Sequence, residues 1–326
     1  MASASLNEIY AIRPDLQAAF DEHGAPIGTA AGFLMNFEDW ARQYGWQEYP
    51  ELAGYAPAAK APVSIAHAVA APNVTSYAYV VVDDASGAIL AAQHAERSWP
   101  IASITKLMTT EVALDGGLDV GGTGSVRATD DVGGAKLHVT DGTKFTTRDL
   151  LAATLVGSAN NAANAVARLS GMQRVSFVNA MNARAKELGL SRTTFVDPTG
   201  IEVENVSTAR EVAAFADDAF NHDAIRTFCG SSKTVVSALN DAAYVRTIQN
   251  TNWMLYDPAY DDIYVTAGKT GFLYESGWNV VVQMHPMGED MSRSLTIVLL
   301  GADGRRESFD DAAALARWAW RSMSWK

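Results

Sequence analysis

The sequence predicts an α+β fold in which one antiparallel sheet lies between layers of helices. Two observations lead to this prediction. Runs of β-branched and aromatic residues occur near position 80 and again in the last third of the chain, whereas the residues between them show helical spacing. Strands grouped near both ends of a domain, with helices between them, favour segregated layers over alternating βαβ units. The early and late strands should therefore share one sheet.

The elements follow from local signals. Strands are expected over 77–82 and 88–93, joined by the turn-forming residues 83–87, and over 263–267, 279–284 and 295–300. Helices are expected over 102–114, 147–155, 160–169, 175–188, 206–220 and 311–323. Pro100 precedes the first of these helices and Gly116 follows it, in keeping with proline near a helix start and glycine past its end. Ser207 is the expected cap of the helix over 206–220.

The first seventy residues differ from the rest. Apolar residues recur at helical spacing over 6–20 and 37–46, and a stretch rich in alanine and proline follows over 56–62. We expect residues 1–70 to form a helical N-terminal extension with a linker, and residues 71–326 to form the catalytic domain. A binding or tethering module is the alternative for the extension.

Composition excludes several classes of protein. The chain has 326 residues, of which 48% are hydrophobic, so it is expected to fold without disulfide bonds or a structural metal. Its net charge of -12 disfavours nucleic-acid binding. No run of 18 apolar residues indicates a membrane span. The single cysteine, Cys229, excludes an internal disulfide, makes a structural zinc site unfavourable and is expected to be buried and inert.

The first chemical signal is a serine and a lysine three residues apart. Ser103 and Lys106 would share one face at the start of a helix. Serine is a weak nucleophile that needs an adjacent base, and a lysine serves as that base when burial lowers its pKa. A helix N-terminus also supplies backbone N–H donors where an oxyanion would develop. Alone, the pattern is common on solvated helix faces.

Two further motifs follow in the chain. Ser158 and Asn160 lie between two expected helices, where a hydroxyl and an amide would face a cleft. The tripeptide Lys269–Gly271 follows an expected strand and combines a cation for a carboxylate, a hydroxyl from Thr270 and a glycine that admits a substrate backbone. Each signal is weak by itself, because Ser5-Leu6-Asn7 repeats the Ser-x-Asn pattern with no evident role.

The order of the three motifs resembles the active-site set of penicillin-binding proteins and serine β-lactamases. The sequence over 100–109 resembles the nucleophile segment of low-molecular-mass D-alanyl-D-alanine carboxypeptidases and endopeptidases, which form peptidase family S11. The resemblance to this family runs from about residue 75 to the end of the chain. Further segments carry the same resemblance: Asp197–Ile201, Asn205–Ala209, Asn250–Asn252, Gly268–Phe272 and Ser276–Asn279. Two positions depart from the family pattern. Residue 159 is alanine where glycine is common, and Ser308 occupies the place of an arginine for which Arg305 or Arg306 would substitute.

The resemblance implies a β-lactamase/transpeptidase-like fold with a helical subdomain. It implies a penicillin-binding, serine-type D-Ala-D-Ala carboxypeptidase, a hydrolase that cleaves peptidoglycan stem peptides through an acyl-enzyme. Its implied catalytic residues are Ser103, Lys106 and Ser158, and its implied substrate-binding residues are Asn160, Lys269, Thr270, Gly271 and Phe272. The backbone N–H groups of Ser103 and Phe272 would form the oxyanion hole. Neither a cofactor nor a metal is implied, and β-lactam antibiotics are expected ligands.

Several alternatives stay open on sequence grounds. The enzyme alternatives are a DD-endopeptidase that cleaves peptide crosslinks and a β-lactamase, and the non-enzyme alternative is a penicillin sensor or wall-binding protein. The six histidines are scattered, with no His-Glu-x-x-His spacing for zinc and no Gly-x-Ser-x-Gly elbow. No apolar leader opens the chain. Since the expected substrate lies outside the cytoplasm, we expect an extracytoplasmic protein whose leader was removed.

Overall fold

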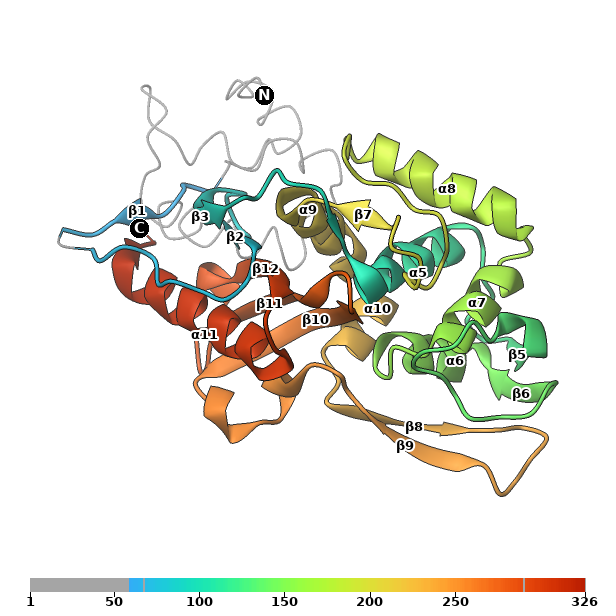
Figure 1. The fold of residues 1–326 in the computed structure, drawn as a ribbon. Coiled ribbons are helices and arrows are strands. Elements are labelled where there is room, and N and C mark those ends of the chain that lie inside the picture. Colours follow the sequence, from blue (N-terminus) through green and yellow to red (C-terminus); the bar gives the residue numbers. More distant parts are fainter. Residues whose placement is uncertain (1–58, 67, 290, 326) are drawn as a thin grey trace, which may run out of the picture. The chain divides into compact units, whose positions relative to one another are not determined.

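The computed structural model describes residues 59–66, 68–289 and 291–325. The expectations for residues 1–58 lie outside this range. The described chain is built on a five-stranded antiparallel sheet with the strand order β10-β11-β12-β2-β3 (Figure 1). Its strands are β2 (Ala78–Asp83), β3 (Ile89–Gln93), β10 (Ile263–Leu273), β11 (Gly277–Pro286) and β12 (Leu295–Ala302). The prediction of one antiparallel sheet shared by early and late strands is confirmed.

Apolar residues on both faces of the sheet explain why helices cover both sides. Along β2, Val80 packs in one buried cluster and Val81 in the other, and along β12 Val298 and Ile297 alternate in the same way. Helix α11 (Arg305–Ser322) covers one face and packs on β11 and β12, whereas α9 (Ala209–Phe220) packs on β12 and β2 from the other (Figure 1). Because neighbouring strand residues point to opposite faces, this alternation requires two cores.

A helical subdomain lies on the α9 side of the sheet. Its members are α5 (Thr105–Asp115), α6 (Thr147–Leu155), α7 (Asn160–Leu169) and α8 (Arg174–Glu187), with α10 (Asp223–Cys229) packed between α6 and β10. Helix α5 is central, since nine of its residues, Thr105 to Ala113, are buried. The buried Glu111 of α5 accepts from Arg184 of α8, which also pairs with Asp218 of α9. The helix that follows Ser103 is thereby held on several sides.

Short elements depart from the sequence prediction. The helix expected over 206–220 begins only at Ala209, because β7 (Val206–Ser207) pairs with β4 (Trp99–Pro100). Thr208, not Ser207, caps the helix, since its side chain accepts from the backbone N–H of Glu211 at 3.1 Å. Helix α10 and two hairpins were not predicted: β5 (Thr123–Val126) with β6 (Thr143–Thr146), and β8 (Lys233–Ser237) with β9 (Val245–Gln249). Short 3₁₀ turns are η4 (Ala102–Ile104), η5 (Ala128–Asp130), η6 (Trp253–Leu255), η7 (Pro258–Tyr260) and η8 (Met291–Arg293).

Residues just after the undescribed segment belong with the C-terminal helix. Strand β1 (Val63–Ser64) pairs with β13 (Met323–Ser324), and the indole N–H of Trp318 donates to the carbonyl of Val69 at 2.8 Å. A compact unit accordingly begins at Lys60. Within the described part of the chain, no helix combines the length and the apolar character that a bilayer span requires.

Candidate active site

Ser103 lies in the 3₁₀ turn η4, immediately before α5 begins. Lys106 occupies the first turn of α5 and is fully buried, and its Nζ lies 2.8 Å from the Oγ of Ser103. The three-residue spacing therefore brings hydroxyl and amine into direct contact, as the sequence predicted. Ser103 itself is half-buried and lines a pocket, so its Oγ is the reachable atom of the pair.

The buried position of Lys106 favours its neutral form. Its Nζ also lies 2.7 Å from the Oδ1 of Asn160 and 2.6 Å from the carbonyl oxygen of Thr199. Burial lowers the pKa of Lys106 well below its usual value, the charge of Lys269 lowers it further, and Asp197 opposes the shift. A neutral amine in hydrogen-bond contact with a serine can serve as its general base.

The carbonyl of Thr199 is placed by a buried carboxylate. Asp197 accepts hydrogen bonds from the N–H and hydroxyl of Thr199, from the N–H groups of Gly200 and Glu202, and from the side chain of Asn205. Burial alone would raise the pKa of Asp197, but these hydrogen bonds outweigh it and hold the pKa below its usual value. The segment over 197–205, which resembles family S11, thus holds the carbonyl of Thr199 against the Nζ of Lys106.

Two residues near Ser103 have left-handed backbones. Ala102, which precedes Ser103, has φ 49°, and Ser158 has φ 57°. A non-glycine residue in this region costs on the order of 1 kcal/mol or more, and such strain persists only where the surroundings impose it. The Oγ of Ser158 lies 2.8 Å from the Nζ of Lys269. The strained turn between α6 and α7 therefore directs the hydroxyl of Ser158 toward Lys269 of β10.

Asn160 is held in place by backbone groups. It is the first residue of α7, its N–H donates to the carbonyl of Ala135 at 2.7 Å, and its side-chain Nδ2 donates to the carbonyl of Gly133 at 2.8 Å. With its Oδ1 on Lys106, the amide group is oriented on both sides. The second hydrogen of Nδ2 is the donor that remains for a ligand.

Lys269, Thr270 and Gly271 lie inside strand β10, which continues to Leu273 instead of ending at Ala267 as predicted. Glycines at 268 and 271 weakened the strand signal, yet both meet close neighbours. A Cβ at Gly271 would lie 2.6 Å from the carbonyl oxygen of Ile101 and 3.1 Å from the N of Ser103. Glycine is therefore what allows the strand to touch the nucleophile turn.

Lys269 is the second buried lysine of the site. It is 1% exposed, and burial lowers its pKa to about 8. Thr270 donates its hydroxyl hydrogen to the hydroxyl of Thr251 at 2.7 Å. At neutral pH most of Lys269 is still protonated, so the strand offers a cation and a hydroxyl beside Ser103.

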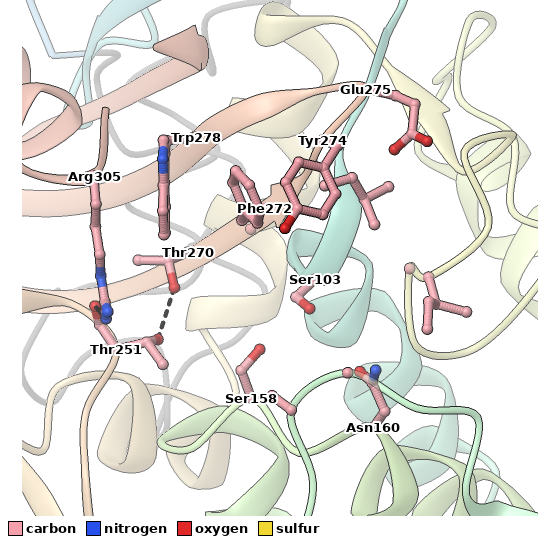
Figure 2. A pocket seen from close by; sticks show the side chains of 16 residues that line it. Ser103, Ser158, Asn160, Thr251, Thr270, Phe272, Tyr274, Glu275, Trp278 and Arg305 are labelled. Atoms are coloured by element: carbon pink, nitrogen blue, oxygen red, sulfur yellow. Dashed lines mark hydrogen bonds between the residues drawn. The ribbon is translucent and has the colours of Figure 1, made fainter. Parts of the chain in front are cut away.

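The three motifs meet at one pocket of about 410 Å³ (Figure 2). Ser103, Ser158, Asn160, Thr270, Gly271 and Phe272 line it, whereas Lys106 and Lys269 lie buried behind it. Sequence reasoning assigned no site role to four lining residues that lie inside segments carrying the family resemblance: Gly200, Ile201, Thr251 and Trp278. It did not single out five others: Gly134, Ala135, Leu273, Tyr274 and Glu275. The last three directly follow the segment Gly268–Phe272, and this proximity was the available signal.

The structure distinguishes the two candidate arginines. Arg305 lines the pocket (Figure 2). It donates to the carbonyl of Thr251 at 2.8 Å and lies over the ring of Trp253 at 4.5 Å. Arg306 is instead half-exposed and pairs with Asp257 at 2.7 Å. Arg305 is therefore the guanidinium that faces the site, one helical turn before Ser308.

Other candidate groups do not join this site. Cys229 is buried, and burial raises the pKa of its thiol to about 12, as expected for an inert side chain. Of the four histidines that the structure describes, none lines the pocket. No His-based triad with Ser103 is therefore formed within the described residues.

The sequence matches the D-alanyl-D-alanine carboxypeptidase family, Peptidase S11, over residues 65–304. The chain belongs to this family. It is 30% identical to the D-alanyl-D-alanine endopeptidase of Pseudomonas aeruginosa over 249 residues, which cover 76% of this chain and 77% of that protein. It is 29% identical to the D-alanyl-D-alanine endopeptidase of Escherichia coli, with 81% of this chain and 83% of that protein covered.

Solved structures agree with this family. The D-alanyl-D-alanine carboxypeptidase of Mycobacterium tuberculosis superposes with a TM-score of 0.69 at 26% identity, covering 79% of this chain and 96% of that one. The Streptomyces K15 DD-transpeptidase superposes with a TM-score of 0.71 at 23% identity, covering 78% of this chain and all of that one, and so shares the fold. The predicted β-lactamase/transpeptidase-like fold is confirmed, and the chain is a serine-type DD-peptidase of family S11.

Proposed function

We propose that this family member is a D-Ala-D-Ala carboxypeptidase that releases the terminal D-alanine of peptidoglycan stem peptides. The contact that supports the proposal most is the one between the buried Nζ of Lys106 and the Oγ of Ser103, 2.8 Å apart at the floor of the pocket. The neutral amine takes the hydroxyl proton as Oγ attacks the scissile carbonyl. The N–H groups of Ser103 and Phe272 stabilise the oxyanion.

The remaining polar groups have complementary roles in this proposal. Ser158 passes a proton to the leaving amine, and the Nδ2 of Asn160 donates to the amide carbonyl on the acyl side. Lys269 and Thr270 bind the terminal carboxylate, and Arg305 joins them from the start of α11. Water then hydrolyses the acyl-enzyme. Because stem peptides lie outside the cytoplasm, the protein would act in the periplasm or at the cell surface.

A DD-endopeptidase is the second candidate, favoured by the names of the curated relatives. In both reactions the leaving amine belongs to a residue with a free carboxylate. That residue is the terminal D-alanine in the carboxypeptidase reaction and part of the crosslinked partner peptide in the endopeptidase reaction. The same Ser103 and Lys269 would serve both. Substrate preference, not a different mechanism, separates the two.

One experiment tests the assignment and ranks the two reactions. The protein is incubated with a pentapeptide that ends in D-Ala-D-Ala and, separately, with a purified D-Ala-crosslinked dimer, and products are followed by mass spectrometry. We expect D-alanine release from the pentapeptide, abolished by Ser103→Ala with an unchanged melting temperature. Faster cleavage of the dimer than of the pentapeptide would favour assignment as an endopeptidase over a carboxypeptidase. Appreciable turnover by the Ser103→Ala protein would contradict the assignment of Ser103 as the nucleophile.

A further inference from the structure

The pocket carries one charge at each end. Among the sixteen described residues that line it, only Arg305 and Glu275 have charged side chains. In Figure 2, Arg305 and Thr270 lie to the left of Ser103, Tyr274 lies above it, and Glu275 lies to the upper right. A ligand that spans the pocket across Ser103 would therefore meet opposite charges at its two ends.

The carboxylate of Glu275 is available for a ligand. Its side chain is exposed, and within the described part of the chain it has neither a hydrogen bond nor an ion pair. The turn that carries it is fixed, because the Oγ of Ser276 accepts from the N–H of Leu273 at 3.1 Å and donates to the carbonyl of Gly277 at 2.9 Å. The acid is thus presented at the mouth by an ordered turn between β10 and β11.

The proposed reaction gives the substrate a direction. Its terminal carboxylate belongs to the leaving residue and lies at the end with Lys269 and Arg305. The scissile carbonyl lies at Ser103, so the acyl side must extend the other way, past Phe272 toward Tyr274. Strand β10 is the outer strand of the sheet and can support an extended peptide alongside it. At about 3.3 Å per residue, the amino acid before the acyl D-alanine reaches the Tyr274 end.

The chemistry at this end suits a long aliphatic side chain with a terminal cation. Tyr274 is 95% exposed and lies edge-on to Phe272, with ring centroids 5.5 Å apart, and Phe272 in turn lies 4.3 Å from the ring of Trp278. Exposed aromatic rings cover methylene groups and attract ammonium groups at their faces. A free carboxylate next to them pairs with an ammonium.

We propose that Tyr274 and Glu275 form a subsite for the side-chain ammonium of a diamino acid that precedes D-alanine on the acyl side. This subsite rests on the proposed function, because the direction of the substrate follows from it. It would make the enzyme prefer stem peptides in which the side-chain amine of the diamino acid is free over stem peptides in which this amine is acylated. The preference is electrostatic and partly exposed to solvent, so it should weaken as salt is added.

The test compares two peptides that differ in one charge. Nα-acetyl-L-Lys-D-Ala-D-Ala keeps its ε-ammonium, whereas Nα,Nε-diacetyl-L-Lys-D-Ala-D-Ala does not. We expect kcat/KM to favour the first peptide about threefold to fivefold at low salt, the range of a partly exposed ion pair. The ratio should fall to about 1 in Glu275→Gln and stay unchanged in Glu187→Gln, an exposed glutamate on α8. Tyr274→Ala should raise KM for both peptides.

The outcomes separate the two proposals. D-alanine release from both peptides at equal rates, or a preference that persists in Glu275→Gln, would overturn the ammonium subsite and leave the peptidase intact. Release from neither peptide would contradict the proposed function. In that case, titration of the Ser103→Ala protein with both peptides measures the subsite directly, and equal dissociation constants would overturn it.

Discussion

Two buried lysines share this site, and the proposed mechanism gives them opposite protonation states. In that mechanism Lys106 is neutral to accept the proton of Ser103, whereas Lys269 is charged to bind a carboxylate. Burial lowers the pKa of both, and the charge of Lys269 lowers that of Lys106 further. The charge of Lys269 thus favours the neutral form of Lys106, so these neighbouring titratable groups take different protonation states.

A bell-shaped pH profile follows from this division. As pH rises through the lowered pKa of Lys106, the base loses its proton and kcat/KM for D-alanine release should rise. As pH rises through about 8, Lys269 loses its charge and kcat/KM should fall. Rates measured from pH 5 to 10 check this. In Lys269→Arg the fall in kcat/KM at alkaline pH should disappear, because the guanidinium stays charged. A wild-type rate that still rises at pH 9.5 would contradict the assignment of the alkaline fall to Lys269.

Penicillin should acylate Ser103 and leave slowly. Rapid deacylation needs a carboxylate that positions water, as in class A β-lactamases. Here Asp197 is already occupied by five donor groups, and Glu202 and Glu204 do not line the pocket. Glu275 does line it, but on the exposed turn between β10 and β11, and in the proposals above it binds the acyl side of the substrate. We expect an adduct that persists for minutes or longer, measured as the mass of the intact protein after addition of benzylpenicillin. Hydrolysis at many turnovers per second would instead indicate a β-lactamase.

At the residue scale, the sequence predicted the side chains of the site but missed one backbone contact of Lys106. Ser103, Lys106, Asn160 and Lys269 were identified because motif spacing places particular side chains together. The carbonyl of Thr199, which contacts Lys106 at 2.6 Å, was not, because every residue has a carbonyl and only the fold aims it. Arg305 could not be separated from Arg306 for a similar reason, since neighbouring residues on a helix point about 100° apart.

At the level of elements, the site depends on a contact between β10 and η4. Helix α7 and strand β12 were predicted nearly to their bounds, whereas the longest helix that the structure describes, α11, begins at Arg305 and not at residue 311 as predicted. The missed elements are short and depend on partners: β7 exists because it pairs with β4, and this pairing displaces the start of α9 to Ala209. Likewise β10 runs through two glycines because its neighbours leave no space for a Cβ there.

Gly271→Ala should separate the strand from the nucleophile turn. The added Cβ would lie 2.6 Å from the carbonyl oxygen of Ile101, so η4 must shift and carry Ser103 with it. A displacement of about 1 Å at a reacting group costs up to about 10²-fold in rate. We expect penicillin acylation at least tenfold slower, with the helical circular dichroism retained. Gly121→Ala, where the nearest atom is 3.5 Å away, is the matched control; acylation of Gly271→Ala at the wild-type rate would show that the contact is dispensable.

At the scale of the whole molecule, every residue of the candidate site lies in the unit that begins at Lys60. Residues 60–75 nevertheless do more than link. Ala71 and Val74 pack on the cluster beneath α11, and Thr75 donates to Asp311 through its N–H at 2.8 Å and its hydroxyl at 2.9 Å. With the β1–β13 pairing, these contacts connect the start of the unit to its last helix.

Two truncations test where the functional unit begins. A chain that starts at Lys60 should keep the melting temperature of the catalytic unit and full D-alanine release, because it loses none of these contacts. A chain that starts at Ser76 should still react, but its free energy of unfolding should fall by about 2–4 kcal/mol. The N–H of Trp318 loses its acceptor, Asp311 keeps the donor groups of Ser76 but loses those of Thr75, and apolar surface is exposed. Chemical denaturation measures the stability of both truncated chains, and the rate of penicillin acylation measures their reactivity. If the chain from Lys60 folds but is inactive, residues 1–59 contribute to the site; if the chain from Ser76 is equally stable, the contacts of residues 60–75 carry no free energy of folding.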